Sequence, residues 1–550
     1  MLLDLLHSGA RPSDLSLATC KNNTAVMNGL LARLAPGDTL LVPPNNSFCM
    51  MGGITHGRNT RGLRDVVLRF DGNLVFWSPD SAMTDLHEWP VDPSSGPDKS
   101  VLECIDLWNM VNVTFTSIGD RGHRGGGVID GSGANWWGYL KYAVRSENRP
   151  RLLHVRNSSQ LLIENLLLKD SPCWTTYFDD VSDLVIRYTD IDVKVNQHAT
   201  YHDRTELGAF NTDGFDVSGK NVHVHDCNVW NDDDCIAVKA NGPRDQQSQC
   251  SENMLFERIN ASGIGLTIGS VGGGGDCVRN ITFRDIVMPR TWKGIYVKAR
   301  PTDCEDDANP GTFLPAPCGS ISDVLYQNIT MEQPMGEGSW AVWIGPQQAI
   351  YPGACSLFWP DTPGTSCPMT PNVSIADVTL RDVLIKSPSN SPGVLVGNHD
   401  RPMRNITFDN VTVLASGADK PLSPWGDAHY ACYGVVGGIA TGGTTPQPPC
   451  FNGNCVRDGQ CISQATGDTP CCTGRRHVAL DCEGAHGTSH RCGCLADGTC
   501  ATSTLECCSN TSHHTANCLA SGQTVRCGSA DDAEARVASS RFAWGNSFKS

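Results

Sequence analysis

Short runs in which apolar and polar residues alternate recur along most of the chain. Most copies begin with Asn or Asp, and several close on a second Asp or Asn followed by an apolar residue. Alternation with a period of two indicates a short β-strand, and the polar residue between two such runs indicates a turn. The copies begin at Asn112, Gln160, Asp183, Asn221, Asn253, Asn280, Asp323, Asp377 and Asn405.

The spacing of these copies predicts how the strands are arranged. Neighbouring copies lie about twenty to about fifty residues apart, within or just beyond the range of stacked repeat architectures. Strands that recur in this way predict an all-β fold, a right-handed parallel β-helix with long loops on one face. An antiparallel sandwich is the alternative, but it needs frequent two-residue hairpin turns, and the sequence contains few of them.

The amino-acid composition changes after Tyr433. A stretch rich in Gly, Thr and Pro reads as a linker, and beyond it the same order of six cysteines occurs twice. With almost no aliphatic core, each repeat needs about three disulfides to fold, and the pattern resembles knottin-like miniproteins. The cysteines are Cys455, Cys461, Cys471, Cys472, Cys482 and Cys492, then Cys494, Cys500, Cys507, Cys508, Cys518 and Cys527.

These boundaries predict the domain organisation. The order is an N-terminal segment (1–19), the β-helix (20–434), the linker (435–449), a first cysteine-rich repeat (450–493), a second (494–527) and a tail (528–550). A small disulfide-rich C-terminal region therefore follows the β-helix. Of the 26 cysteines, twelve belong to the repeats, Cys432 and Cys450 suggest a bridge across the linker, and twelve remain in the β-helix. Even counts predict complete pairing rather than a free catalytic thiol.

The cysteine usage also predicts where the protein works. Twenty-six cysteines and several Asn-x-Ser/Thr sequons, at Asn112, Asn157, Asn280, Asn328 and Asn405, indicate an oxidising, glycosylating export route, although some sequons arise by chance. The first ten residues make a poor signal peptide, so secretion is inferred from cysteine usage alone. No apolar run is long enough to cross a membrane. We expect a secreted monomer without membrane partners.

A formal net charge of −16 argues against nucleic acid as a partner, because phosphate binding depends on Lys and Arg. The same charge fits an acidic sugar polymer poorly, but binding is decided by the local field of a cleft. One basic stretch runs against the overall charge, with only Asp285 opposing it. It contains Arg279, Arg284, Arg290, Lys293, Lys298 and Arg300. For Arg290, Lys293 and Arg300, each taken singly, a solvated surface position is the simpler interpretation.

Two acidic segments carry the candidate chemistry. Asp213 lies in Asn-Thr-Asp-Gly, and Asp233 and Asp234 follow about one coil of a β-helix later, so the three should face one another. Clustered carboxylates raise one another's pKa, which destabilises a fold unless a reaction uses it. Glycoside hydrolysis by inversion needs an acid and a base about 6.5–9.5 Å apart. Turn caps or a cation site would explain either segment alone, but both at coil spacing favour catalysis.

These segments resemble the Asn-Thr-Asp and Asp-Asp-Cys motifs of glycoside hydrolase family 28, the polygalacturonases and their relatives. Four further blocks resemble the same family, and the likeness spans about residues 20 to 430. They are Gly126 to Trp137, which resembles Gly-x-Ile-Asp-Gly-x-Gly-x-x-Trp-Trp, then Arg149-Pro150, Ser171-Pro172-Cys173-Trp174, and Ser262 to Gly273, which resembles the Gly-His-Gly-x-x-Ile-Gly-Ser block.

The resemblance implies a role for each candidate residue. Asp233 is expected to be the general acid, and Asp213 and Asp234 to hold and deprotonate the attacking water. Asn211 is expected to orient Asp213 or the substrate, and Lys298 to grip a sugar carboxylate. The expected substrate is an acidic, pectin-like cell-wall polysaccharide, and the reaction requires no cofactor or metal, including calcium.

The chain departs from the family pattern at two positions. Ile264 stands where polygalacturonases have the histidine of Gly-His-Gly, and Tyr296 stands where they have the arginine of Arg-Ile-Lys. Ile donates no hydrogen bond and Tyr carries no positive charge. Rhamnogalacturonan-cleaving relatives also lack this histidine, so the change predicts either another substrate or a substitute cation. Arg290, Lys293 or Arg300 could be that substitute, and Arg300 joins the predicted substrate-binding residues.

Two other functions remain open at this point. A polysaccharide lyase shares the β-helix and an acidic substrate, but it needs a basic residue to abstract a proton and usually calcium. A non-catalytic wall-binding protein would explain the two departures, with the cysteine-rich tail as its adhesive part. The sequence does not decide between endo and exo cleavage.

Overall fold

The computed structural model describes the β-helical region with gaps at several loops, and only short strands of the C-terminal region. The described residues are 1–78, 88–96, 100–137, 148–194, 209–240, 250–305, 311–334, 340–349, 355–356, 359, 367–398, 400–414, 430–451, 461–462, 476–478, 490–492, 500–501, 512–514 and 525–527.

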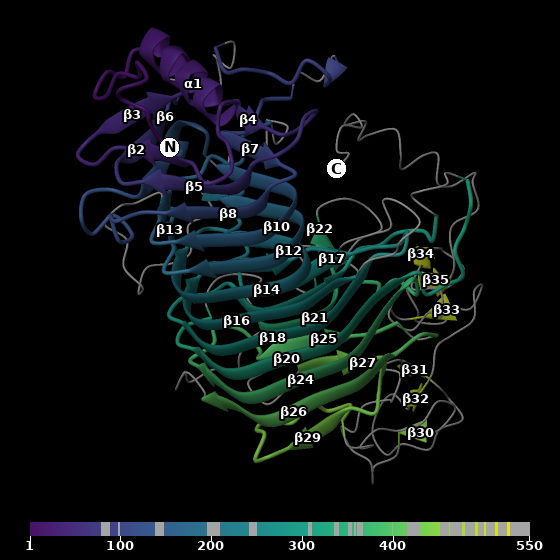
Figure 1. Cartoon of the computed structure of the whole chain (residues 1–550). Coiled ribbons are helices and arrows are strands. Elements are labelled where there is room, and N and C mark those ends of the chain that lie inside the picture. The colour runs from purple at the N-terminus through teal and green to yellow at the C-terminus, as the bar shows by residue number, and fades with distance from the viewer. Residues whose placement is uncertain are drawn as a thin grey trace.

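Three parallel sheets wind along one axis and form a right-handed parallel β-helix, as the repeat predicts (Figure 1). Sheet 1, which carries the candidate site, runs through β4 (Ile54–His56), β7 (Ile105–Trp108), the first residues of β10 (Leu153–Glu164), β12 (Thr176–Arg187) and β14 (Phe215–Trp230), then β15 (Ile236–Val238), β17 (Leu266–Val271), β19 (Lys293–Ala299), β21 (Trp340–Pro346), β25 (Gly393–Val396) and β27 (Tyr430–Tyr433).

The other two sheets share long strands that bend at a corner. Sheet 2 contains β1 (Leu2–Asp4), β2 (Thr39–Val42), β5 (Arg64–Phe70), β8 (Val111–Thr116), the middle of β10, β12 and β14, then β16 (Ser251–Ser262), β18 (Cys277–Met288), β20 (Gly319–Met331), β24 (Val373–Lys386), β26 (Met403–Leu414), β28 (Val435–Val436) and β29 (Ile439–Thr441). Sheet 3 contains β3 (Ser47–Met50), β6 (Asn73–Phe76), β9 (Val128–Asp130), β11 (Leu167–Lys169), β13 (Asp190–Asp192) and the ends of the long strands. Two short elements, η2 (Gly133–Asn135) and the pair β22 (Gln348–Ala349) and β23 (Cys355–Ser356), lie outside the three sheets.

The Asn and Asp residues that mark the sequence repeat form the corners between sheets. Asn112, Asn221 and Asn280 have φ between 54° and 57°, a left-handed conformation that Asn and Asp tolerate better than most side chains. Their amides also form ladders across coils, for example from Asn280 to Asn253 over 2.8 Å. The sequons at Asn112, Asn157, Asn280, Asn328 and Asn405 all occupy such corners, so their residue types also have a structural explanation.

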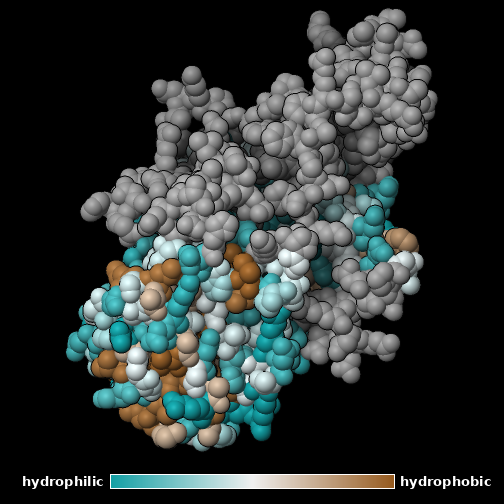
Figure 2. All heavy atoms as spheres, turned by 90° about the horizontal axis from the view of Figure 1, so that it is seen from above, coloured by the Kyte–Doolittle hydropathy of each residue, from teal (hydrophilic) through white to brown (hydrophobic). Residues whose placement is uncertain are grey.

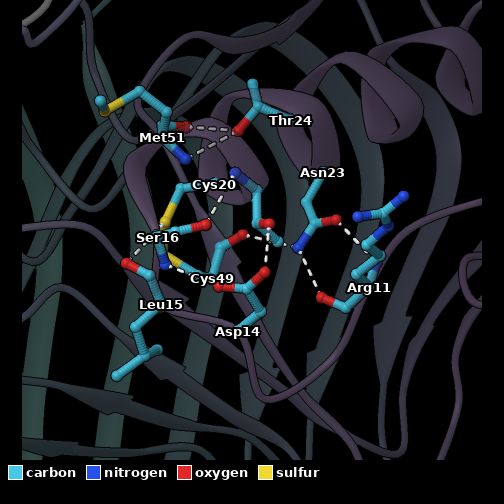
Figure 3. The surroundings of a disulfide bond; sticks show 10 residues. Arg11, Asp14, Leu15, Ser16, Cys20, Asn23, Thr24, Cys49 and Met51 are labelled. Carbon is cyan, nitrogen blue, oxygen red and sulfur yellow. Dashed lines mark hydrogen bonds between the residues drawn. A yellow bond between two sulfur atoms is a disulfide. The ribbon is translucent and has the colours of Figure 1, made fainter.

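The N-terminal end of the β-helix is covered by α1 (Leu17–Leu31). A disulfide joins Cys20 of α1 to Cys49 of β3, and Thr24 both donates to the backbone carbonyl of Met51 and accepts from its N–H, each over 2.8 Å (Figure 3). Seen from this end, hydrophobic and hydrophilic side chains are mixed over the described surface (Figure 2). Because α1 packs against β3 and β4, it covers strands at the N-terminal end of the stack that would otherwise present a free edge. No described helix combines the length and apolar character needed to span a membrane.

Inward-facing side chains build one continuous core, in which Phe256, Phe283 and Tyr326 stack at 4.8 and 4.9 Å in successive coils. The expected complete pairing of cysteines in this region is wrong. Four disulfides form, Cys20–Cys49, Cys250–Cys277, Cys304–Cys318 and Cys355–Cys367, while Cys104, Cys173, Cys227 and Cys235 are free and buried. Burial raises the pKa of Cys227 to about 12, so this thiol acts as a small apolar core residue.

The segment expected to be a linker instead belongs to the β-helix. Residues of β28 and β29 pair in parallel with β26, Phe451 is buried against Phe408, and a disulfide joins Cys432 to Cys450 as the sequence suggests. The two cysteine-rich repeats have the same described topology. Each is a three-stranded antiparallel sheet whose last strand is central, β30 (Cys461–Ile462), β31 (Arg476–Val478) and β32 (His490–Cys492) in one, and β33 (Cys500–Ala501), β34 (Ser512–His514) and β35 (Val525–Cys527) in the other. The remaining residues of both repeats and of the tail (528–550) lie outside the described residues.

Candidate active site

Three aspartates meet at the N-terminal end of β14 and β15 in sheet 1. Asp213 and Asp234 each lie two residues before a strand, and those strands pair through Phe215 and Ile236, so the two segments occupy successive coils. Oxygens of Asp213, Asp233 and Asp234 all lie within 4.8 Å of one another, and the three side chains are almost fully buried. The structure thus brings together the three residues that coil spacing selects.

Asp233 is held by backbone donors on both carboxylate oxygens. The N–H of Asn211 donates to Oδ2 over 3.0 Å, and the N–H of Asp234 donates to Oδ1 over 2.8 Å. Such donors favour the charged form. Burial acts in the opposite direction, and together with the charges of Asp213 and Asp234 it raises the pKa of Asp233 well above its ordinary value. Asp233 is therefore the member of the cluster best suited to carry a proton at neutral pH.

Asp234 has the opposite environment. Lys298 donates to Oδ2 over 2.8 Å and Thr267 donates to Oδ1 over 2.6 Å, so both oxygens accept hydrogen bonds. Burial alone would lower the pKa of Lys298, but the charges of Asp234 and Tyr296 and the hydrogen bond to Asp234 together raise that pKa above the ordinary range. The pair therefore holds a carboxylate and an ammonium side by side.

Asp213 shares a second buried lysine with Asp216. The Nζ atom of Lys239 lies 3.3 Å from Oδ2 of Asp213 and 3.1 Å from Oδ2 of Asp216. Burial raises the pKa of Asp213, and the charge of Lys239 opposes that rise. Burial and the charge of Asp213 raise the pKa of Asp216 well above its ordinary value. Neither Asp216 nor Lys239 was predicted from the sequence, although Asp216 follows Asp213 by three residues and Lys239 follows Asp234 by five.

The predicted substrate-binding residues fall into two groups. Ile264 donates its N–H to the carbonyl of Asp233 over 2.7 Å, and Lys298 contacts Asp234 with its Nζ atom 4.6 Å from the ring centroid of Tyr296, so these three residues lie beside the cluster. Asn211 contacts Asp233 rather than Asp213, and its Oδ1 accepts from Trp174 over 3.1 Å. Arg300 is half exposed and its guanidinium lies 4.0 Å from Asp276, so its described charged neighbour is that residue rather than the cluster.

Two members of the basic stretch are not solvated surface residues, and the interpretation of them as such is wrong. Arg290 is buried, with its Nη2 3.3 Å from Asp232 and its guanidinium over the ring of Trp230. Lys293 is also buried, among aromatic rings near the cluster. Arg279 and Arg284 pair with Glu252 and Glu257 of the previous coil, so the charges of these two arginines are compensated.

The spacing of the three carboxylates bears on two questions, whether they bind a cation and whether hydrolysis inverts the anomeric configuration. Asp213, Asp233 and Asp234 could together ligate a hard cation. Lys239 and Lys298 already supply positive charge to two of these carboxylates, so the cluster does not need an ion for neutralisation. The nearest oxygens lie closer together than the separation of about 6.5–9.5 Å expected between the carboxyl groups of an inverting pair. Their spacing alone therefore does not support inversion.

Comparisons with known proteins identify relatives of the β-helical region. The sequence profile described as "Glycosyl hydrolases family 28" matches residues 105–424. Curated relatives include "Probable endopolygalacturonase C" of Aspergillus aculeatus, 30% identical over 40% of this chain and 50% of its own length, and "Probable endopolygalacturonase A" of Neosartorya fischeri, 30% identical over 38% and 48%. The chain thus spans about half the length of the curated relatives it matches.

Solved structures support the fold. An endo-xylogalacturonan hydrolase from Aspergillus tubingensis superposes with a TM-score of 0.50 at 18% identity, covering 80% of this chain and 98% of that one. An exopolygalacturonase from Thermotoga maritima does so with a TM-score of 0.50 at 16% identity, covering 80% and 92%. At these identities the likeness concerns the β-helix alone.

Proposed function

We propose that this chain, which belongs to glycosyl hydrolase family 28, hydrolyses glycosidic bonds in a pectin-like acidic polysaccharide. One observation carries the proposal. Within a cluster of three buried carboxylates, Asp233 is pushed towards the neutral form while Asp234 is paired with Lys298. Glycoside hydrolysis needs this combination of a proton donor and an ionised carboxylate.

In this mechanism Asp233 gives its proton to the glycosidic oxygen as the bond from the anomeric carbon to that oxygen breaks. A water molecule held by Asp213 and Asp234 attacks the anomeric carbon, and one of these carboxylates takes the proton that the water loses. Asp233 regains a proton from solvent before the next cycle. Direct attack by water inverts the anomeric configuration, and proton NMR of the first product tests this step.

The proposed substrate contacts follow the positions of the neighbouring side chains. Lys298 has three N–H donors and uses one of them on Asp234, so others can reach a sugar carboxylate. Asn211 orients Asp233 through its backbone, and Tyr296 and Ile264 form an apolar wall beside the cluster. Arg300, paired at the edge with Asp276, would meet only a more distant sugar.

The cellular setting is also a proposal. The four disulfides of the β-helical domain and the Cys432–Cys450 bridge support an extracellular enzyme. We propose that the two cysteine-rich repeats are disulfide-held modules that tether the enzyme to the wall, and that the protein acts as a monomer.

The experiment is incubation with homogalacturonan, rhamnogalacturonan and algal uronans, followed by product sizing. New reducing ends without an unsaturated product, lost in Asp233→Asn, support the hydrolase. An unsaturated product would identify a lyase, and binding without cleavage would identify a wall-binding protein. Long intermediate products at early times indicate endo cleavage, whereas single sugars indicate exo cleavage.

A further inference from the structure

Lys293 stands in the same column of side chains as the acidic cluster. Asp234 lies two residues before Ile236, Ile264 two before Leu266, and Lys293 two before Ile295, and the three later residues pair with one another in successive strands. The backbone N–H of Lys293 donates to the carbonyl of Ile264. The lysine therefore follows Ile264 by one coil.

The amine of Lys293 is surrounded by aromatic faces. Its Nζ atom lies 4.6 Å from the ring centroid of Trp292, 5.3 Å from that of Tyr296 and 6.0 Å from that of Trp343. The residue is only 4% exposed. The side chain thus has a fixed position that is set by three rings.

Lys293 differs from the other buried cations of the site. Lys239, Lys298 and Arg290 each have a carboxylate within 3.3 Å. Within the described part of the chain, no carboxylate lies within 4.0 Å of the amine of Lys293. Aromatic faces attract an ammonium but leave its charge uncompensated. Burial, and next the charge of Lys298, lower the pKa of Lys293 to about 8, and the charges of Asp234 and Asp233, which make no direct contact with the amine, oppose this only in part.

We infer that Lys293 binds the carboxylate of a uronic acid residue in the sugar subsite beside Asp233 and Asp234. This inference rests on the proposed function and adds to it a binding residue and a preference for the free acid over its methyl ester. The ammonium of Lys293 takes the place of the fixed charge that is absent at Tyr296. A free uronate fits this subsite, whereas a methyl ester or neutral sugar leaves the buried ammonium without a counterion.

The test measures binding separately from cleavage. In an Asp233→Asn background, calorimetric titration uses trigalacturonate and its fully methyl-esterified form. Lys293→Met should weaken binding of trigalacturonate roughly tenfold to a hundredfold, the scale of a charge-assisted hydrogen bond, and leave binding of the ester unchanged. Lys293→Arg should retain the preference for the acid. Lys386→Met, at a half-exposed lysine paired with Glu332, is the matched control and should change neither affinity. Lys293→Gln is a second neutral variant in case Lys293→Met fails to fold.

The outcomes separate this inference from the proposed function. Three results would overturn the role of Lys293. They are equal losses of affinity for the acid and the ester, an unchanged affinity for the acid, and no binding of either by the Asp233→Asn protein. Hydrolysis by the wild-type protein is measured on the same two oligosaccharides. If Lys293→Met loses affinity for the acid alone but the wild-type protein hydrolyses neither oligosaccharide, the role of Lys293 stands and the proposed hydrolase is contradicted. If the wild-type protein hydrolyses the acid but Lys293→Met shows no charge-selective loss, the hydrolase stands and the role of Lys293 is contradicted.

Discussion

The Nζ atom of Lys298 lies 2.8 Å from Oδ2 of Asp234, so the lysine that family resemblance assigns to the substrate is already paired with a carboxylate of the protein. Lys298 should therefore act in two ways, by holding Asp234 in position and by meeting a sugar carboxylate. Lys298→Met should lower kcat as well as raise KM, because the loss reaches the proposed base. Steady-state kinetics check this. A change in KM alone, with kcat intact, would show that the contact with Asp234 has no part in the reaction.

The proton donor is tested by Asp233→Asn. This change should lower the rate by about 10² or more, the scale of general acid catalysis. Asn matches the neutral form of Asp233 in size and charge and gives up only one of the two hydrogen bonds from backbone N–H groups, so the protein should remain folded. The matched control is Asp323→Asn, at an exposed corner with φ of 53° where Asn is equally suitable. Activity retained by Asp233→Asn would assign the proton to another residue.

Lys239 should set the pH at which Asp213 works. The charge of Lys239 holds down the pKa of Asp213, which must be ionised to help deprotonate water. Lys239→Met should therefore raise that pKa and move the acid limb of the rate profile to higher pH, with activity lost first at low pH. Breaking a buried ion pair should also destabilise the protein by about 3–5 kcal/mol.

A second substitution separates these two effects of Lys239. Asp216→Asn removes the other carboxylate that Lys239 contacts, so it should restore part of the stability lost in Lys239→Met. In the double variant, the acid limb of the pH–rate profile should remain at the higher pH seen in Lys239→Met, because Asp213 still lacks its ammonium partner. Denaturant unfolding and the pH profile of kcat/KM measure the two effects independently. A profile unmoved by Lys239→Met would make this lysine purely structural.

The sequence predicted the β-helix because its corners require a left-handed backbone conformation, and Asn or Asp occupies many of these positions. Asn112, Asn221 and Asn280 mark left-handed corners, and the strands between them alternate with a period of two. Coil spacing likewise selected Asp213, Asp233 and Asp234. The sequence did not reveal Lys239 and left Lys293 as one of three possible substitute cations, because the surroundings of a lysine are unknown until its neighbours in other coils are known. The same limit made four buried, unpaired cysteines look like disulfide partners.

Metal removal provides another prediction. Lys239 and Lys298 supply positive charge to Asp213 and Asp234, so hydrolysis should not require calcium. Exhaustive dialysis against EDTA should leave kcat/KM unchanged, and added calcium should not raise it. A loss on dialysis that calcium reverses would point to a cation among the three carboxylates and would favour a lyase.

The C-terminal repeats should be separable from catalysis if the cut is placed after the β-helix. Phe451 packs against Phe408 with ring centroids 5.2 Å apart, and Thr444 donates to the carbonyl of Phe408 and accepts from the N–H of Val411, each over 3.1 Å. Truncation after Phe451 keeps these contacts and the Cys432–Cys450 disulfide. It should leave hydrolysis of soluble oligosaccharides intact and reduce activity only on insoluble wall material, where tethering raises the effective concentration.

Truncation after Gly443 is the matched comparison for that cut. It removes Thr444, Cys450 and Phe451, and with them the contacts that close the last coil of the β-helix. Deleting a buried aromatic side chain alone costs about 3–5 kcal/mol. The shorter protein should therefore unfold at a lower temperature, and its activity should fall on soluble and insoluble substrates alike. Equal stability of the two truncations would restore residues 435–449 to the role of a linker. Loss of soluble activity in the longer one would mean that the repeats complete the active site.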